Sequence, residues 1–391
     1  MTRYLHLYRV IAKTFGFWLR PLGAFALLQV RQAISATTLG LDHLFYPRHR
    51  KQVIDRPIFI IGNPRSGTTF LHRLLLGAGD MAAFELWEML FPAITARKLL
   101  GGIVPRLDRL SPARYHPSDV HDTSLRGIET DDVAWFFRTL DGPFAWAYFL
   151  AWQDVWGSEQ SRREFGIDGV SPVKDERFFR YYEACWRRNL TLKRANRILV
   201  KSSMLTFRLE ELLRRYPDCR LVYVVRDPVE VIPSGISLLA SVLENGYDVW
   251  NRTKQEDQQR WIENLYQASC AMLRDFHIAN AAGLIPEANL CVVRYEDLLQ
   301  NLEPTMKRIL DFVEINPSEA FQEEVRQQAE RQRNYNSRHE HSPDQFGLDP
   351  ERIRADLGFV YEAFGLSIPA GGRLQPSGNL DSSSGSADTI G

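Results

Sequence analysis

The chain has 391 residues, of which 45% are hydrophobic and 25% are charged, a composition typical of a soluble globular enzyme. Lysine plus arginine and aspartate plus glutamate are equal at 48 each, so no overall positive field attracts the protein to nucleic acid, and any anion site has to be local. The cysteines lack the short spacing of zinc ligands and of disulfide-rich secreted scaffolds, which predicts a reducing compartment, the cytoplasm; they are Cys185, Cys219, Cys270 and Cys291.

Residues 1–54 are predicted to form an N-terminal helical extension. The stretch around Phe15 and Trp18 is apolar, but only ten uncharged residues separate Arg20 from Arg31, against about 20 needed to cross a bilayer. No convincing signal-peptide cleavage site follows. We expect helices that pack on the core, with peripheral contact at a membrane surface as the alternative.

Short apolar runs rich in β-branched residues predict buried strands, at Ile58–Ile61, Arg197–Val200, Arg220–Val225 and Leu290–Val293. Helix-like periodicity follows these runs, notably at Phe207–Tyr216, Val229–Leu243 and Gln258–Ala282. This alternation predicts an α/β fold, a doubly wound parallel sheet flanked by helices, with a binding site at the carboxyl ends of the strands. We expect this domain to span residues 55–368, and residues 369–391, rich in Gly, Ser, Asp and Asn, to be a disordered tail.

The first predicted strand leads into a glycine loop of the P-loop type. The loop reads Gly62-Asn63-Pro64-Arg65-Ser66-Gly67-Thr68-Thr69 and precedes an apolar-periodic helix. A glycine loop followed by a helix N-terminus presents backbone N–H groups to a phosphate. The spacing nearly matches G-x-x-x-x-G-K-[ST], but Thr68 stands where a triphosphatase has the lysine that reaches the β- and γ-phosphates. Arg65 supplies a cation inside the loop instead.

This loop resembles the 5′-phosphosulfate loop of sulfotransferases that use 3′-phosphoadenosine 5′-phosphosulfate (PAPS). The resemblance is to the broad, mainly microbial group with Asn-Pro-Arg-Ser-Gly-Thr-Thr loops, and it covers roughly residues 57 to 365. It implies that the phosphosulfate is held by Arg65, Ser66, Gly67, Thr68 and Thr69. It also implies that Arg65 neutralises the leaving group, as the family's lysine or arginine does at this place.

A second part of the resemblance follows the strand that ends at Val225. Arg226-Asp227-Pro228 comes directly after it, and Ser234 lies eight residues beyond Arg226. In the family an arginine and a serine at these places bind the 3′-phosphate of the nucleotide, which assigns that role to Arg226 and Ser234. Further similarity at Lys201-Ser202-Ser203, where many relatives have Lys-Ser-Pro, makes Lys201 a second candidate cation.

The acceptor proton needs a base, and a polar segment from Tyr115 to Asp132 supplies candidates. We expect Glu129 to be the base, with His121 as the alternative. The other interpretation is that Glu129, Asp131 and Asp132 cap the helix predicted at 133–140. His72, one turn into the loop helix, is expected to have a packing or supporting role.

Aromatic residues crowd the segment 135–156. Most are expected in the core, but the same residue types suit a lipid-like or a carbohydrate acceptor. The predicted function is transfer of the sulfuryl group of PAPS to a hydroxyl or amine of an unidentified acceptor, by in-line displacement with release of 3′,5′-adenosine bisphosphate (PAP). We expect neither a metal nor a nucleic acid to take part. The alternatives are a P-loop nucleotide kinase or triphosphatase, and a non-catalytic PAP-binding protein of the same fold.

Overall fold

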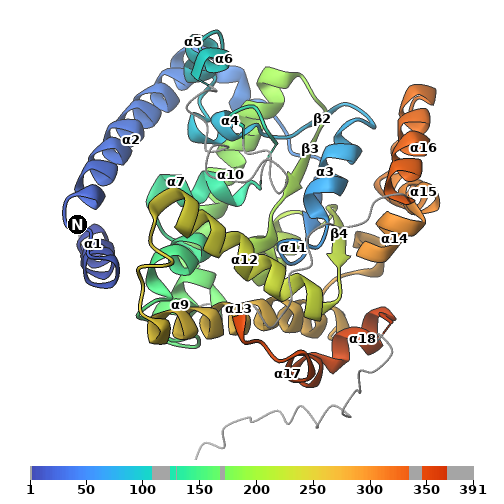
Figure 1. The fold of residues 1–391 in the computed structure, drawn as a ribbon. Helices are drawn as coiled ribbons and strands as arrows, with labels where there is room; N and C mark the ends of the chain where they lie inside the picture. Colours follow the sequence, from blue (N-terminus) through green and yellow to red (C-terminus); the bar gives the residue numbers. More distant parts are fainter. Residues whose placement is uncertain (1, 108–123, 129, 168–171, 334–345, 368–391) are drawn as a thin grey trace, which may run out of the picture.

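The computed structural model describes residues 2–107, 124–128, 130–167, 172–333 and 346–367 (Figure 1). The tail predicted at 369–391 lies outside these residues. Within them, no helix is both long and apolar enough to cross a bilayer.

The centre of the molecule is a sheet of five parallel strands in the order β2-β3-β1-β4-β5. The strands are β1 (Ile58–Ile61), β2 (Met81–Ala82), β3 (Arg197–Lys201), β4 (Arg220–Val225) and β5 (Leu290–Arg294). In the central strand, Phe59 lies opposite Val200 of β3 and Leu221 of β4. The predicted doubly wound parallel sheet is confirmed, and the one strand missing from the prediction, β2, is only two residues long.

Helices cover both faces of the sheet because the strands are apolar on both sides. Phe59 and Ile61 point into one core cluster, and Ile58 and Ile60 point into the other. The smaller cluster is formed by α3 (Thr68–Leu76), α14 (Tyr295–Gln300), α15 (Leu302–Val313) and α16 (Glu319–Arg333).

The larger cluster holds most of the aromatic residues and most of the remaining helices. These are α1 (Thr2–Phe15), α2 (Arg20–Phe45), α4 (Leu86–Leu90), α7 (Asp132–Thr139), α8 (Pro143–Ala145), η4 (Trp146–Leu150), α9 (Glu159–Phe165), α10 (Pro172–Lys193), η6 (Ser203–Arg208), α11 (Leu209–Arg215), α12 (Pro228–Tyr247), α13 (Gln255–Ala281), α17 (Pro350–Asp356) and α18 (Gly358–Phe364). Shorter helices complete the chain at η1 (Pro47–Lys51), α5 (Ile94–Leu100), α6 (Val104–Leu107) and η7 (Glu287–Asn289).

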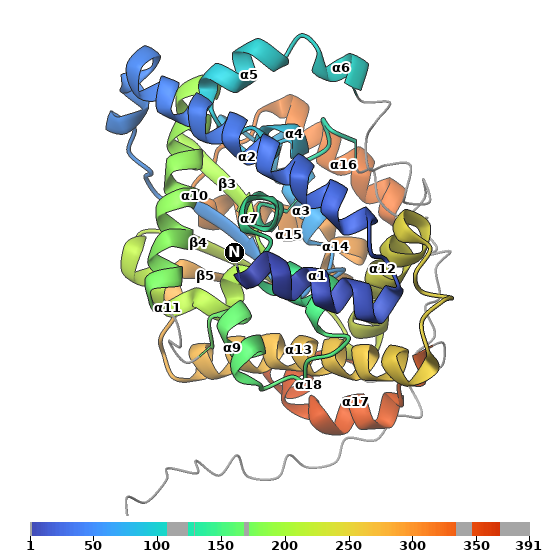
Figure 2. The ribbon, with the colours of Figure 1, turned by 90° about the vertical axis from the view of Figure 1, so that its left-hand side faces the viewer.

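Helix α2 runs across the outside of the molecule in front of α7 and α10 (Figure 2). Buried Asp42 fixes its C-terminal end, because its carboxylate accepts from the amide of Ile94 at 2.9 Å and pairs with Arg188 at 2.8 Å. Arg31 fixes the middle by donating to the carbonyl oxygens of Leu90 and Phe137. The N-terminal helices therefore pack on the core, as predicted.

Candidate functional site

The glycine loop lies between β1 and α3, at the carboxyl end of the central strand. Gly62 and Gly67 have φ of +137° and +91°, and a Cβ atom on them would lie 2.3 Å from the Val224 oxygen and 2.8 Å from the Tyr295 ring. The Ser66 hydroxyl donates to the Asn63 carbonyl oxygen at 2.7 Å, which closes the turn. The first N–H groups of α3 have no acceptor within the helix, so the loop ends at a helix terminus of the kind that suits an anion.

Two segments predicted to hold different phosphates meet beside this loop. Nε of Arg65 donates to the Ser234 hydroxyl at 3.1 Å, and Nη1 of Arg226 donates to the Arg65 carbonyl oxygen at 3.0 Å. Arg226 also pairs with half-exposed Glu230 at 2.8 Å and stacks over the Tyr295 ring at 4.2 Å. The structure thus brings Arg65, Ser66, Gly67, Thr68, Thr69, Arg226 and Ser234 together, as the sequence predicted; their binding roles stay predictions.

Lys201 is the cation that reaches the start of the loop helix. It is the last residue of β3 and lies opposite Ile60 of β1. Its side chain is buried, and Nζ donates to the Thr69 hydroxyl at 2.7 Å. The sequence offered Lys201 only as a second candidate cation, whereas the structure places its ammonium group on Thr69, at the end of the glycine loop.

Asp131 is the N-cap residue of α7 and Asp132 is its first residue, but in the described part of the chain neither carboxylate accepts from the first amides of that helix, so the capping interpretation is wrong for both. Asp132 accepts from the Thr130 hydroxyl at 2.7 Å, from the Ser203 amide at 3.1 Å and from the Ser202 hydroxyl. Asp131 accepts from the Trp186 indole at 3.1 Å. Both acids are buried; the Asp132 side chain ties the start of α7 to the chain that follows β3, and the Asp131 side chain ties it to α10. An acidic pair before an apolar helix looks the same in sequence whether it caps the helix or faces the core.

Burial changes the protonation of the two acids and of His72. It raises the pKa of Asp131 to about 8, and it raises the pKa of Asp132 against hydrogen bonds from Ser202 and Thr130 that favour the ionised form. His72 is fully buried and contacts the Leu199 carbonyl oxygen at 3.2 Å. Burial and the Lys201 charge lower its pKa to about 3, so His72 is neutral at physiological pH, which fits the predicted packing role.

The two predicted bases, Glu129 and His121, lie outside the described residues. The residues on either side of Glu129 are described: Ile128 forms an antiparallel bridge with Glu85, and the Thr130 hydroxyl donates to the Lys201 carbonyl oxygen at 3.1 Å. Among the described residues, no group of three or more His, Cys, Asp or Glu is arranged to hold a metal ion.

Aromatic residues extend from the buried acids toward the surface. The tryptophans of segment 135–156 are mainly core, with Trp146 and Trp152 fully buried. Phe136, by contrast, is partly exposed and lies within 6.4 Å of four other partly exposed rings, those of Phe137, Phe144, Tyr148 and Phe149. A narrow space of about 10 Å³ lies between Asp132, Phe136, Phe144, Met204 and their neighbours. It lies between these rings and Asp132, which belongs to a polar cluster formed by Thr130, Asp131, Asp132 and Ser202.

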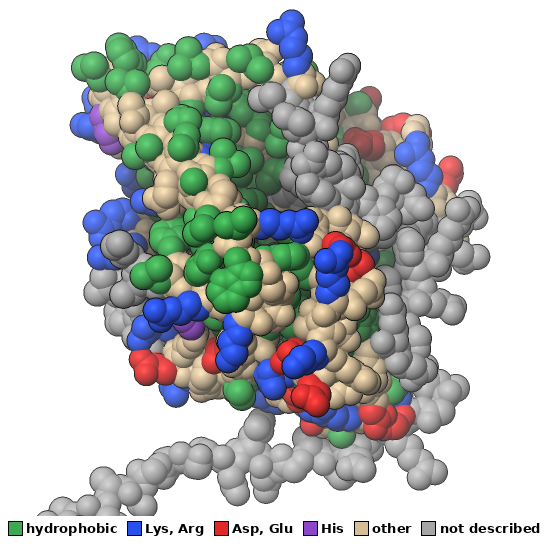
Figure 3. All heavy atoms as spheres, turned by 60° about the vertical axis from the view of Figure 1, so that its left-hand side comes forward, with side chains coloured by type: hydrophobic (Ala, Val, Ile, Leu, Met, Phe, Trp, Pro, Cys, Tyr) green, Lys and Arg blue, Asp and Glu red, His purple; other side chains and the backbone are tan. Residues whose placement is uncertain are grey.

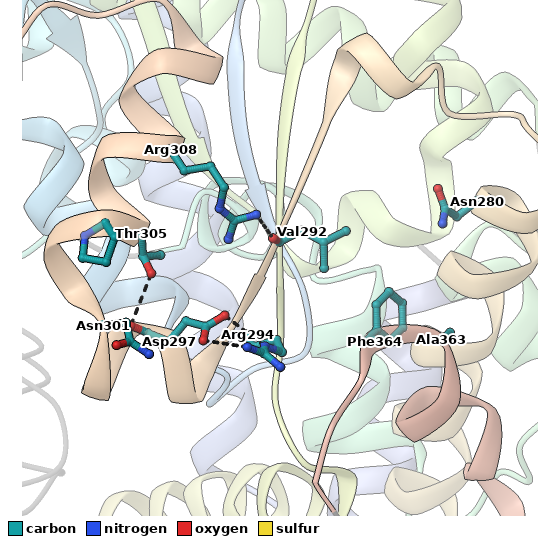
Figure 4. Close-up of a pocket in the computed structure, with 10 residues that line it drawn as sticks. Asn280, Val292, Arg294, Asp297, Asn301, Thr305, Arg308, Ala363 and Phe364 are labelled. Atoms are coloured by element: carbon teal, nitrogen blue, oxygen red, sulfur yellow. Dashed lines mark hydrogen bonds and ion pairs between the residues drawn. The ribbon is translucent and has the colours of Figure 1, made fainter.

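A larger concavity of about 590 Å³ lies on the outer edge of β5, two strands from the loop (Figure 4). Its charged groups are bonded to one another or to the backbone: Arg294 pairs with Asp297 at 2.9 Å, and Arg308 donates to the Val292 carbonyl oxygen at 2.9 Å. No loop residue lines it, so we place the functional site at the loop rather than here.

The known proteins that resemble this chain are sulfotransferases. A profile described as "Sulfotransferase family" matches residues 57–319. The curated omega-hydroxy-beta-dihydromenaquinone-9 sulfotransferase Stf3 of Mycobacterium bovis is 25% identical over 312 residues, which are 78% of this chain and 75% of that protein. Among solved structures, sulfotransferase STF9 from Mycobacterium avium has a TM-score of 0.62 at 16% identity, covering 86% of this chain and 83% of that one. Sulfotransferase STF1 from Mycobacterium tuberculosis has a TM-score of 0.57 at 20% identity, covering 90% and 88%.

Proposed function

The chain belongs to the sulfotransferase family and catalyses sulfuryl transfer, and we propose that its donor is PAPS and its acceptor a hydroxyl group on a lipid-like molecule. The family match decides against the nucleotide kinase, in line with Thr68 at the lysine position. We also propose that residues 55–368 form the sulfotransferase domain behind an N-terminal extension of residues 1–54. Four buried, unpaired cysteines support a reducing, cytoplasmic location.

The observation that carries the donor proposal is the contact between Arg65 and Ser234. It joins the phosphosulfate loop to the helix that follows β4, so one nucleotide with two separate phosphates can reach both. The 5′-phosphosulfate would lie on the amides of Gly67, Thr68 and Thr69, and the 3′-phosphate between Arg226 and Ser234. Oxygens of the 3′-phosphate would take the place of the exposed Glu230 carboxylate on Arg226. They would accept a charge-assisted hydrogen bond like the one that Glu230 accepts.

The reaction that these groups support is an in-line displacement. The acceptor oxygen forms a bond to sulfur while the bond from sulfur to the 5′-phosphate oxygen breaks, PAP leaves, and the acceptor proton passes to a base. Negative charge develops on the leaving oxygen, so cations fixed beside it stabilise the transition state more than the ground state. Lys201 contacts Thr69 of the loop helix, whereas Arg65 contacts Ser234. We therefore propose that Lys201 shares with Arg65 the neutralisation of the leaving group.

Variants of the two cations test this assignment. Lys201→Ala and Arg65→Ala are each expected to lower kcat about 10²–10³-fold, with a smaller loss in PAP affinity for Lys201→Ala. Arg73→Ala is the control, because Arg73 is an exposed cation on the outer side of α3. Steady-state kinetics and calorimetry with PAP separate the two effects. Equal losses in kcat/KM and in PAP affinity would make the residue a binder of the ground state only.

Glu129 remains the proposed base, with His121 as the alternative. Support comes from its chain neighbour Thr130, which contacts the Lys201 carbonyl oxygen beside the loop. Glu129→Gln and His121→Asn keep the side-chain shape, and the variant of the true base should lose about 10²–10⁴ in kcat with PAP affinity unchanged. Normal kcat in both variants would place the base elsewhere.

A lipid-like acceptor is supported over a carbohydrate by the partly exposed rings around Phe136, which offer apolar contact next to the polar cluster. The relative Stf3 is named for a hydroxylated menaquinone, which supports the same class. The test is mass-spectrometric detection of sulfated product from PAPS with a long-chain prenol, its methyl ether as the hydroxyl-blocked control, and a sugar of equal hydroxyl concentration. Transfer to the sugar alone would reject the lipid class; PAP binding without transfer to any alcohol or amine would favour the non-catalytic alternative.

A further inference from the structure

The outer face of α2 carries an apolar stripe, in which Thr37 is the exposed polar residue between Ile34 and Leu41. Its large exposed residues are three, four or seven positions apart, as one face of a helix requires; they are Leu27, Val30, Ile34, Leu41 and Leu44. Leu27 and Leu44 are 71% and 72% exposed. Between Arg20 and Asp42 the one charged side chain is Arg31, whose guanidinium donates inward to two backbone carbonyls. From Leu27 to Leu44 the stripe is about 26 Å long at the rise of an α-helix.

Neighbouring elements extend this surface. Trp18 and Leu19, before α2, are 63% and 80% exposed, and Leu99 on the adjacent α5 is 69% exposed. Figure 3 shows hydrophobic side chains gathered over one side of the molecule. A contiguous exposed apolar surface of this extent marks a binding face in a soluble protein.

The charges around the stripe indicate what it binds. Residues 2–54 hold eight lysines and arginines and one acid, so their formal net charge is 8 − 1 = +7, although the whole chain has a net charge of zero. The acid is Asp42, which is fully buried. Exposed cations flank the stripe at both ends, with Lys13 and Arg20 at one end and Arg48, Arg50 and Lys51 at the other. A second copy of this face would bring cations against cations in either orientation, which disfavours self-association.

We propose that α1, α2 and η1 dock this protein on the surface of an anionic lipid bilayer, with α2 lying in the interface. An apolar helix face bordered by lysine and arginine gains from insertion among acyl chains and from attraction to anionic headgroups. Docking would also orient the site. Gln32 and Arg31 of α2 contact the backbone of α7 at Arg138 and Phe137, and α7 begins at Asp132 in the polar cluster. The membrane surface would therefore lie next to the helix that borders the proposed acceptor side.

Vesicle flotation tests the docking without any use of catalysis. The wild-type protein is expected to bind phosphatidylcholine vesicles containing 30 mol% phosphatidylglycerol at least tenfold more tightly than pure phosphatidylcholine vesicles, and to lose most of this preference in high salt. The triple variant Leu27→Glu, Val30→Glu, Leu44→Glu is expected to weaken binding at least tenfold. Its control, Val155→Glu, Ile278→Glu, Leu284→Glu, changes exposed apolar residues outside the N-terminal helices and should bind as wild type.

A charge reversal separates the electrostatic contribution. Lys13→Glu with Lys51→Glu should weaken binding to the anionic vesicles about tenfold. The exposed control pair Lys254→Glu with Arg331→Glu, directly before α13 and on α16, should not. Calorimetry with PAP verifies that each variant is folded, so a failure of docking is distinct from a failure of the proposed donor site. Equal vesicle binding by the triple variant and its control would overturn the proposal. So would a wild-type dimer in light scattering that the triple variant converts to a monomer, since the face would then bind a second copy.

Discussion

Asp131 is expected to keep its proton in the folded protein at neutral pH. Burial raises its pKa to about 8, against 3.8 for an ordinary aspartate, and its Oδ1 has no hydrogen-bond partner among the described residues. Between these two pKa values the unfolded chain releases a proton that the folded chain retains, so this group makes the free energy of unfolding fall as pH rises. From pH 4 to pH 7 the difference covers about three units, or roughly 4 kcal/mol at 1.36 kcal/mol per unit.

Asp131→Asn removes this dependence while keeping an oxygen for the Trp186 indole. Any packing cost of the amide is independent of pH, so the informative quantity is the change with pH. Relative to wild type, the variant should gain roughly 4 kcal/mol in free energy of unfolding between pH 4 and pH 7. Urea unfolding followed by tryptophan fluorescence measures it, with Asp311→Asn, whose side chain is 66% exposed, as the control. Parallel curves for Asp131→Asn and wild type would refute a protonated Asp131.

Further outcomes are expected at the loop and its surroundings. Arg226→Ala should weaken PAP about 10–100-fold and leave adenosine 5′-monophosphate, which lacks the 3′-phosphate, unaffected in calorimetry; equal effects on both would reject the 3′-phosphate assignment. Gly67→Ala should reduce PAP affinity, because its Cβ would lie 2.8 Å from the Tyr295 ring, whereas Gly235→Ala, with open space around it, should not. His72→Gln should lose less stability than wild type between pH 6.5 and pH 3, because the lowered pKa of His72 makes the unfolded state bind an extra proton in this range; identical acid unfolding would contradict it. Activity should survive EDTA, because side-chain cations serve the loop; loss on chelation with recovery in magnesium would contradict that.

The sheet and the loop could be predicted because their signals are local. Strands buried on both faces are continuous apolar runs, and β1, β3, β4 and β5 were found within one residue of the predicted bounds. The loop between β1 and α3 depends on glycines at fixed offsets. The meeting of Arg65 with Ser234 followed from the rule that parallel strands end at the same edge of a sheet.

The burial of a side chain and the direction in which it points could not be predicted from such local signals. Asp131 and Asp132 have the position of capping acids, and only the packing of α10 against α7, through Trp186, turns Asp131 inward. The overall charge of zero likewise concealed the cationic N-terminal region, since 48 positive and 48 negative residues balance over the whole chain. Which side of α2 faces outward depends on Asp42 and Arg31, whose partners lie 52 or more residues away.

Protonation explains how acidic residues can lie next to a site for an anion. If His72 were protonated and both acids were ionised, the positive charges of His72 and Lys201 would be nearly balanced by the negative charges of Asp131 and Asp132. The electrostatic field at Thr69 would then depend on this balance. Instead burial keeps His72 neutral, with its pKa at about 3, and Asp131 neutral at pH 7, with its pKa at about 8. Asp132 is directed by three donors toward the chain that follows β3, while Nζ of Lys201 faces the loop. In a buried setting a fixed cation acts strongly on nearby charge, so a neutral Asp131 would oppose the proposed interaction of Lys201 with the leaving oxygen less than an ionised Asp131 would.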